Sequence, residues 1–245
     1  MINNIDNIDD ITFDFFYKKK VIALQRKEGY RFSVDSPMLA DFLPFSPNDK
    51  AIEIGTGSGI ISLLALYKKK FSYIYGIEIQ DKLSRLAEKN AKKNNLNQKF
   101  KVINADFNEV YKNFSGIKTI FSNPPFKKKH AGRLSPNEEI KISKTEIKIT
   151  LIELLKKSFS ILGEKGSLYL ILPNNRYEEL IRLSNDIGYF VSKLRHVISF
   201  KDGKIERFLI QLTNYRGSFK ELKPLIIFKH KGVYTKEMED ILSGN

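Results

Sequence analysis

The residues with the clearest chemical potential are Asn-Pro-Pro-Phe at 123–126, which follow a short apolar run at 118–122. That run indicates a buried strand, so the tetrapeptide begins where a strand ends. Asn123 offers a side-chain oxygen as a hydrogen-bond acceptor, and the two prolines stiffen the turn and leave carbonyls such as that of Pro124 free. Phe126 adds a flat apolar ring. Together these groups predict a rigid clamp for a planar group with an exocyclic NH2, although Asn and Pro are also ordinary turn residues.

A second candidate site lies upstream, where an apolar strand at 51–55 runs into the alternate glycines Gly55, Gly57 and Gly59. Glycines allow a tight turn and a close backbone approach to a ligand, and the helical pattern that begins at Ile60 places a helix N-terminus beside them. A nicotinamide-binding fingerprint would need glycine at position 60, so the pattern does not indicate that cofactor.

Polar residues also follow the next two predicted strands. The strand at 73–78 ends on Glu78, whose carboxylate could accept both hydroxyls of an adenosine ribose. The strand at 100–104 is followed by Asp106, which could accept from an adenine amine, and by Phe107, which could pack against the adenine face. Each signal is weak alone, but four successive strand ends at the carboxyl edge of one sheet together predict a nucleoside-containing cofactor.

These motifs resemble those of the class I S-adenosylmethionine-dependent amino-methyltransferases. The motifs are Glu-Ile-Gly-Thr-Gly-Ser-Gly at 53–59, Gly-Ile-Glu at 76–78, Ala-Asp-Phe at 105–107 and Asn-Pro-Pro-Phe at 123–126. Within that class the chain is similar to the bacterial tRNA(Val) adenine-37 N6-methyltransferase family. The narrower resemblance rests on residues 29–36, 132–139, 224–228 and 234–237, and it extends over roughly residues 20–242.

The resemblance implies S-adenosylmethionine as the cofactor and tRNA as the substrate. The implied cofactor contacts are Glu53, Gly55, Gly57, Gly59, Glu78, Asp106, Phe107 and Asn123. The implied catalytic residues are Asn123, Pro124 and Phe126, which would hold the reacting amine of an anticodon-loop adenine.

Phe126 leaves the target base open, because adenine enzymes often have Tyr there and Asn-Pro-Pro-Phe is also usual in ribosomal RNA guanine-N2 methyltransferases. A protein-glutamine methyltransferase would share the same clamp, but the basic residues beside it argue against a small amide substrate. An RNA-binding module without catalytic activity is the alternative from another functional class.

The net charge of +14 and the pI near 9.6 favour a polyanionic partner. Lys127, Lys128, Lys129 and Arg133 directly follow the clamp, so we expect them to contact RNA phosphates; the alternative is a solvated run that aids solubility. Further lysines occur at 18–20 and at 68–70, and the latter are expected to close a helix.

The composition argues against several kinds of site and against a membrane protein. The chain has no cysteine and only three histidines, which argues against disulfides, a cysteine nucleophile and a metal site. It contains no apolar run of membrane-spanning length, and its acidic N-terminus does not resemble a signal peptide. We expect a cytoplasmic protein, with a monomer favoured.

The order of elements predicts a Rossmann-like α/β fold: a doubly wound, mainly parallel sheet of seven strands whose last strand is antiparallel. Residues 1–35 are expected to form a basic and aromatic extension that is hairpin-like within 10–34, and residues 36–245 the methyltransferase domain. Besides the strands given above, strands are predicted at 167–172, 192–200 and 207–214. Helices are predicted at 58–69, 81–95, 146–162 and 175–187, with another beginning near Ser36-Pro37.

Overall fold

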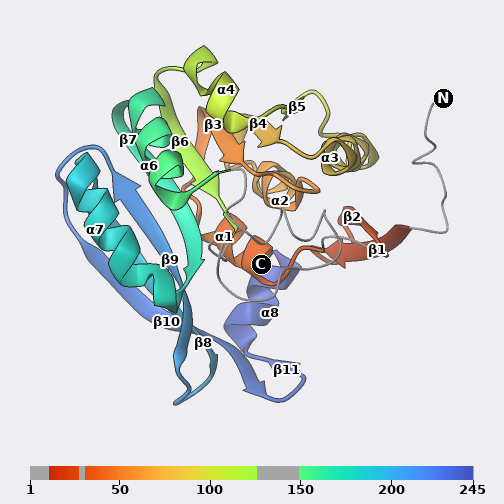
Figure 1. Cartoon of the computed structure of the whole chain (residues 1–245). Helices are drawn as coiled ribbons and strands as arrows, with labels where there is room; N and C mark the ends of the chain where they lie inside the picture. Colours follow the sequence, from red (N-terminus) through yellow and green to blue (C-terminus); the bar gives the residue numbers. More distant parts are fainter. Residues whose placement is uncertain (1–10, 28–30, 126–148, 245) are drawn as a thin grey trace.

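The computed structural model describes residues 11–27, 31–125 and 149–244, and its centre is a nine-stranded sheet (Figure 1). The sheet has the order β11-β10-β8-β9-β7-β6-β3-β4-β5. Its strands are β3 (Ser46–Ile54), β4 (Phe71–Glu78), β5 (Phe100–Asn104), β6 (Ile117–Ser122), β7 (Leu162–Pro173), β8 (Phe190–Phe200), β9 (Ile205–Thr213), β10 (Lys220–His230) and β11 (Val233–Tyr234).

Helices cover both faces of this sheet. They are α1 (Asp35–Phe42), α2 (Ile60–Tyr67), α3 (Asp81–Lys93), α4 (Phe107–Val110), α6 (Leu151–Ile161), α7 (Tyr177–Ile187) and α8 (Lys236–Ser243), with short 3-10 turns η2 (Tyr111–Asn113) and η3 (Asn174–Arg176). One core contains α1, α2, α3 and α8, and the other contains α6 and α7. Successive strand residues point to opposite faces, so Phe121 enters the first core and Ile120 the second.

The predicted sheet class is confirmed. Strands β5, β4, β3, β6 and β7 are parallel neighbours, and β9, the last of the predicted strands, runs antiparallel to both β7 and β8. The sheet is larger than the seven strands predicted, because β10 pairs parallel to β8 and β11 pairs antiparallel to β10. Strand β10 was not predicted, because its sequence contains several charged residues and Pro224. Proline cannot donate to a ladder, and the register of β10 shifts between Leu222 and Leu225, on either side of it.

Helix α6 differs from its prediction at both ends. It begins after Thr150, whose hydroxyl caps the helix while the Glu153 carboxylate accepts from the Thr150 backbone N–H. Residues 146–148 of the predicted helix lie outside the described residues. The helix ends at Ile161, one residue before its predicted end, and β7 begins directly at Leu162 instead of at 167, so that Gly163 and Gly166 lie within the strand.

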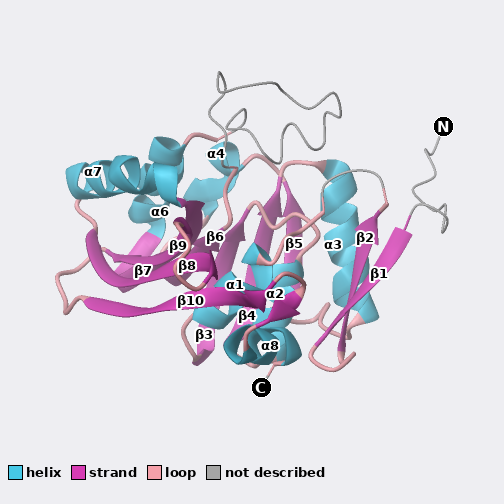
Figure 2. Ribbon diagram, turned by 90° about the horizontal axis from the view of Figure 1, so that it is seen from below, coloured by secondary structure: helices cyan, strands magenta, loops and turns pink. Residues whose placement is uncertain are grey.

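The N-terminal hairpin is confirmed over its described part. Strands β1 (Ile11–Phe16) and β2 (Val21–Arg26) form a separate two-stranded antiparallel sheet that lies beside α3 (Figure 2). Side chains of Asn90 in α3 and of Asn94, directly after that helix, hold β2 as a neighbouring strand would. Asn94 bonds both backbone groups of Ile22, and Asn90 bonds both those of Leu24.

Candidate active site

A cavity opens at the carboxyl ends of β3, β4 and β6, where the predicted motifs converge. Its walls are residues 54–58, 78–80 and 122–125, together with Glu53, Phe32, Ser36, Ile149 and nearby aliphatic side chains. It encloses about 780 Å³ of empty space, counting its open mouth. Aliphatic walls with a few convergent polar groups, among them two carboxylates, are typical of a small-molecule site.

The glycine-rich turn after β3 needs glycine for two different reasons. Gly55, Gly57 and Gly59 all have φ between +57° and +83°, a region that side chains other than glycine rarely adopt. At Gly59 a Cβ atom would also lie 2.8 Å from the Phe100 ring. Gly55 and Gly57 line the cavity, whereas Gly59 lies outside its wall at the start of α2, close to Phe100, and its contact with the cofactor stays a prediction.

Glu78 links the glycine turn to the end of β4. Its carboxylate accepts from the Gly57 N–H at 2.8 Å and from the Gln80 N–H at 2.9 Å. The side chain is buried and lines the cavity. The glycine turn and the loop after β4 therefore both donate to the Glu78 carboxylate. These bonds hold the carboxylate in the cavity wall, where it could also accept from ribose hydroxyls.

Glu53 is the second buried carboxylate of the cavity. Its Oε2 atom accepts from the hydroxyls of Thr56 (2.6 Å) and Ser62, while Oε1 has no hydrogen-bond partner among the described residues. Burial raises the pKa of Glu53 to about 8, against the smaller lowering effect of the two hydroxyls. An unpartnered buried carboxyl oxygen beside a cavity fits a ligand that brings a hydrogen-bonding group to it.

The Asn123 turn is placed as predicted, at the end of β6 and in the cavity wall together with Pro124 and Pro125. The preceding Ser122 hydroxyl donates to the Ile54 carbonyl at 2.7 Å and ties β6 to β3 at this edge. The Oδ1 atom of Asn123 is buried and, in the described part of the chain, accepts no hydrogen bond. An acceptor in this state fits the NH2 clamp predicted from the sequence.

Asp106 and Phe107 follow β5 at the same sheet edge, but they are not part of the cavity wall. The Asp106 carboxylate caps α4 by accepting from the Asn108 N–H at 2.8 Å, and Phe107 is buried in the second core. Their assignment to adenine stays a prediction. Phe126, Lys127, Lys128, Lys129 and Arg133 lie outside the described residues.

The structure adds cavity residues that had no predicted role. Phe32 and Ser36 belong to the stretch at 29–36 that carried the resemblance, yet only the folded chain brings them opposite the glycine turn. Between them lies Asp35, which is buried, with its Oδ1 atom 2.8 Å from the Arg207 Nε atom of β9. This ion pair fixes the start of α1 against the sheet.

Comparison with known proteins gives the family. The model of the family described as "Methyltransferase small domain" matches residues 31–191, more than half of the chain. The chain belongs to this methyltransferase family. Family and fold imply S-adenosylmethionine as its cofactor, and the cavity provides groups that fit it: a glycine turn, the Glu78 carboxylate and the unpartnered Glu53 oxygen.

Two curated relatives resemble this methyltransferase over nearly its whole length. Both are named tRNA1(Val) (adenine(37)-N6)-methyltransferase. The protein from Proteus mirabilis is 26% identical over 92% of this chain and 90% of its own. The protein from Bacteroides thetaiotaomicron is 23% identical over 93% of this chain and 94% of its own.

Solved structures support the same fold. A predicted O-methyltransferase from Agrobacterium tumefaciens aligns with a TM-score of 0.66 at 14% identity, over 85% of this chain and 95% of its own. The M. jannaschii tRNA m1G37 methyltransferase aligns with a TM-score of 0.61 at 18% identity, over 85% of this chain and 58% of its own.

The described part of the chain has neither a metal-binding cluster nor a helix that could span a membrane. Residues 11–27, 31–125 and 149–244 contain no cluster of three or more His, Cys, Asp or Glu residues arranged to hold a metal ion. None of the helices in these ranges has the length and apolar character needed to cross a membrane.

Proposed function

We propose that this methyltransferase methylates N6 of an adenine in tRNA, with position 37 of valine tRNA as the favoured target. The names of relatives that align over more than nine-tenths of both chains support the substrate. The high net charge of +14 supports a polyanionic partner. A tRNA substrate would place the activity in the cytoplasm.

The observation that carries the proposal is the buried, unpartnered Oδ1 atom of Asn123 at the end of β6. The lone pair of an adenine N6 amine is delocalised into the ring, so the amine is a poor nucleophile. Asn123 Oδ1 and the Pro124 carbonyl would each accept one of its hydrogens and favour a more pyramidal, electron-rich nitrogen. An adenine in a single-stranded loop reaches such a site at least cost, because no base pair has to be broken.

Other residues have supporting roles in this proposal. When bound, S-adenosylmethionine supplies the activated methyl group. The chain provides Gly55 and Gly57 against its methionine portion and Glu78 for its ribose; Asp106 and Phe107 are proposed for its adenine. Phe126 is proposed to stack on the substrate base, which would fix the ring and contribute to the rate through positioning.

The competing target is guanine N2 in ribosomal RNA, because Phe126 completes a tetrapeptide that is usual in such enzymes. Mass spectrometry of nucleosides from RNA incubated with the protein and S-adenosylmethionine distinguishes the two. N6-methyladenosine in tRNA supports the proposal, and N2-methylguanosine in ribosomal RNA contradicts it.

Asn123→Ala tests the role of the clamp. We expect this variant to lose most turnover while its cofactor affinity stays within about twofold, because the acceptor serves mainly the substrate nitrogen. Asn48→Ala is a matched control, since Asn48 is exposed near the opposite end of β3. Wild-type turnover in Asn123→Ala would show that the turn is only structural. Among ring variants, Phe126→Leu should lose activity and Phe126→Tyr should keep much of it.

A further inference from the structure

The N-terminal hairpin presents an apolar face that no described residue covers. Phe13 and Phe15 are two residues apart on β1 and therefore point to the same side, where they are 51% and 53% exposed. Their cross-strand partners, Leu24 and Ile22, lie on the same side and are only partly buried. The outer face of β1 therefore presents two exposed phenyl rings on the same side.

The opposite face of the hairpin is packed against the core, so the face with Phe13 and Phe15 points to solvent. Phe16, Val21 and Ala23 are buried in the first core, and Gln25 is buried beside them. The hairpin is thus a single layer, and its inner face packs against the core of the protein. An exposed apolar face of this kind indicates a binding partner.

The charge of the hairpin indicates the chemistry of that partner. Residues 11–27 contain five cations, at 18, 19, 20, 26 and 27, and a single acid, Asp14. That acid lies on the inner side, where it is paired with Arg31 at 3.2 Å. The lysines at 18–20 are exposed at the tip, in a tight turn where Tyr17, Lys18 and Lys19 all have positive φ. Phenyl rings beside lysines suit a nucleic acid, whose bases stack and whose phosphates are negative.

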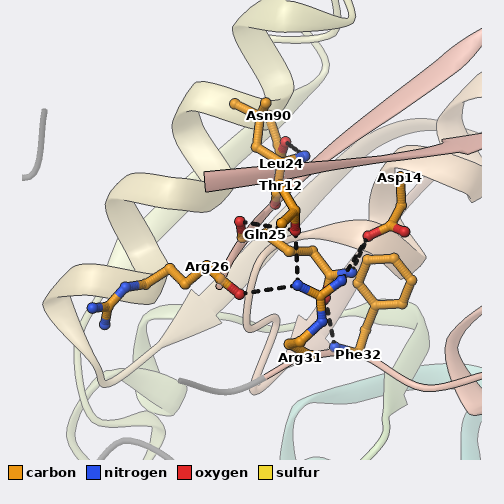
Figure 3. Close-up of polar contacts among 8 residues, drawn as sticks. All are labelled: Thr12, Asp14, Leu24, Gln25, Arg26, Arg31, Phe32 and Asn90. Carbon is orange, nitrogen blue, oxygen red and sulfur yellow. Dashed lines mark hydrogen bonds and ion pairs between the residues drawn. The ribbon is translucent and has the colours of Figure 1, made fainter. Parts of the chain in front are cut away.

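Hydrogen bonds connect this hairpin to two walls of the cavity. The Gln25 amide oxygen accepts from the N–H of Phe32, a cavity residue, at 2.9 Å, and its amide nitrogen donates to Asp14. The Arg31 guanidinium contacts Thr12, Asp14 and the Arg26 carbonyl, which holds the chain next to Phe32 (Figure 3). On the other side, the Asn90 amide donates to Leu24 of the hairpin and to Ser58 of the glycine turn.

We propose that the outer face of the β1–β2 hairpin is a stacking platform for unpaired nucleotides of the RNA substrate. Phe13 and Phe15 stack on bases, and the lysines at 18–20 contact phosphates. Phe16 on the inner face packs against Phe32 of the cavity wall, with ring centroids 5.5 Å apart, so the hairpin that would hold the RNA adjoins the cavity that receives the target base. This inference rests on the proposed function and identifies where that RNA binds.

The test measures the affinity of the full-length protein for a valine tRNA transcript by filter binding. We expect Phe13→Ala/Phe15→Ala to bind the tRNA at least tenfold more weakly, since each stacked base contributes appreciably. Phe13→Tyr/Phe15→Tyr should keep the affinity, because a flat ring remains. Phe13→Leu/Phe15→Leu should lose it, although leucine is equally apolar.

Matched control variants distinguish stacking on the hairpin from the loss of an exposed ring or charge anywhere on the protein surface. Phe219→Ala removes a phenylalanine that is 55% exposed beside β10, and it should leave tRNA affinity unchanged. Replacing lysines 18–20 with Gln should flatten the slope of log affinity against log salt by up to about three units, whereas Lys201→Gln/Lys204→Gln in the exposed β8–β9 turn should not. S-adenosylmethionine affinity, measured by calorimetry, should be the same in every variant and shows that each one folds.

Two results would overturn the inference. One is an unchanged tRNA affinity in Phe13→Ala/Phe15→Ala. The other is a dimer of the wild type in sedimentation experiments that becomes a monomer in Phe13→Ala/Phe15→Ala, while the tRNA affinity is unchanged. That result would show that the partner of this face is a second copy of the chain. Neither result touches the proposed function, which fails separately if wild-type protein produces no N6-methyladenosine in tRNA.

Discussion

Glu78 holds two backbone N–H groups, those of Gly57 and Gln80, and so sets the spacing between two loops of the cavity. We expect Glu78→Ala to weaken S-adenosylmethionine binding by roughly 1.5–3 kcal/mol, because a charge-assisted hydrogen bond to the ligand is lost. Calorimetry measures the change, with Glu88→Ala on the exposed side of α3 as the control. Unchanged cofactor affinity in Glu78→Ala would contradict the ribose assignment.

Glu53 should make the stability of the ligand-free protein depend on pH. Its pKa rises from 4.5 to about 8 on folding, because burial disfavours the charged form. Below pH 4.5 the group is protonated in both states; between pH 4.5 and 8 it ionises in the unfolded chain only. The stability that it contributes is therefore lost progressively as the pH rises through this window.

The matching variant is Glu53→Gln, which cannot ionise. The free energy of unfolding of the wild type, relative to that of Glu53→Gln, should fall between pH 5 and pH 8 by at most about 1.4 kcal/mol per pH unit. Urea titrations at several pH values measure this difference. A difference that is independent of pH would show that Glu53 is ionised in the folded protein.

Single residues were predictable where a strand end and a characteristic side chain coincide. Asn123, Glu78 and the glycines Gly55 and Gly57 all line the cavity as the sequence indicated. Phe32 was not assigned a role, because its place in the cavity depends on a hydrogen bond from its backbone to Gln25 of the hairpin. Contacts of that kind leave no periodic pattern in a sequence.

At the level of elements, α3 is the support on which the hairpin rests. The Asn90 amide bonds Leu24 through both its oxygen (2.7 Å) and its nitrogen (3.1 Å), and the same nitrogen reaches Ser58 at 2.8 Å. We expect Asn90→Ala to lower the free energy of unfolding by about 2–4 kcal/mol, because buried backbone groups lose their partners. Denaturant titration against Glu88→Ala, two residues away on the same helix, measures the loss. Equal stability of the two variants would mean that water replaces the amide.

Elements with clear periodicity were predicted, and those stabilised by the rest of the fold were not. The strands from β3 to β9 are apolar runs bounded by turns, and all were anticipated. Strand β10 carries Pro224 and several charges, so its sequence resembles a loop, and only pairing with β8 makes it a strand. The start of β7 was misplaced for a related reason: glycines that usually separate elements are here part of the strand, and a Cβ at Gly163 would lie 2.9 Å from the Gly116 backbone.

For the whole molecule, the net charge of +14 predicts that tRNA affinity depends strongly on salt concentration. Replacing Lys127, Lys128 and Lys129 with Ala should weaken tRNA binding and flatten its salt dependence by up to about three units in log–log slope. Cofactor affinity should hardly change. Filter binding at several salt concentrations measures the slope, and identical slopes for wild type and variant would show that these lysines are merely solvated.

The hairpin near the start of the chain also meets the last described helix. The Tyr17 N–H donates to the Leu242 carbonyl of α8 at 3.1 Å, and the Tyr17 ring packs so close to Gly244 that a Cβ there would lie 2.5 Å away. A ribosome makes the hairpin more than two hundred residues before α8. The contact at the hairpin tip therefore forms only after those residues have been made, and a nascent chain stalled before residue 236 has that tip without its support from α8.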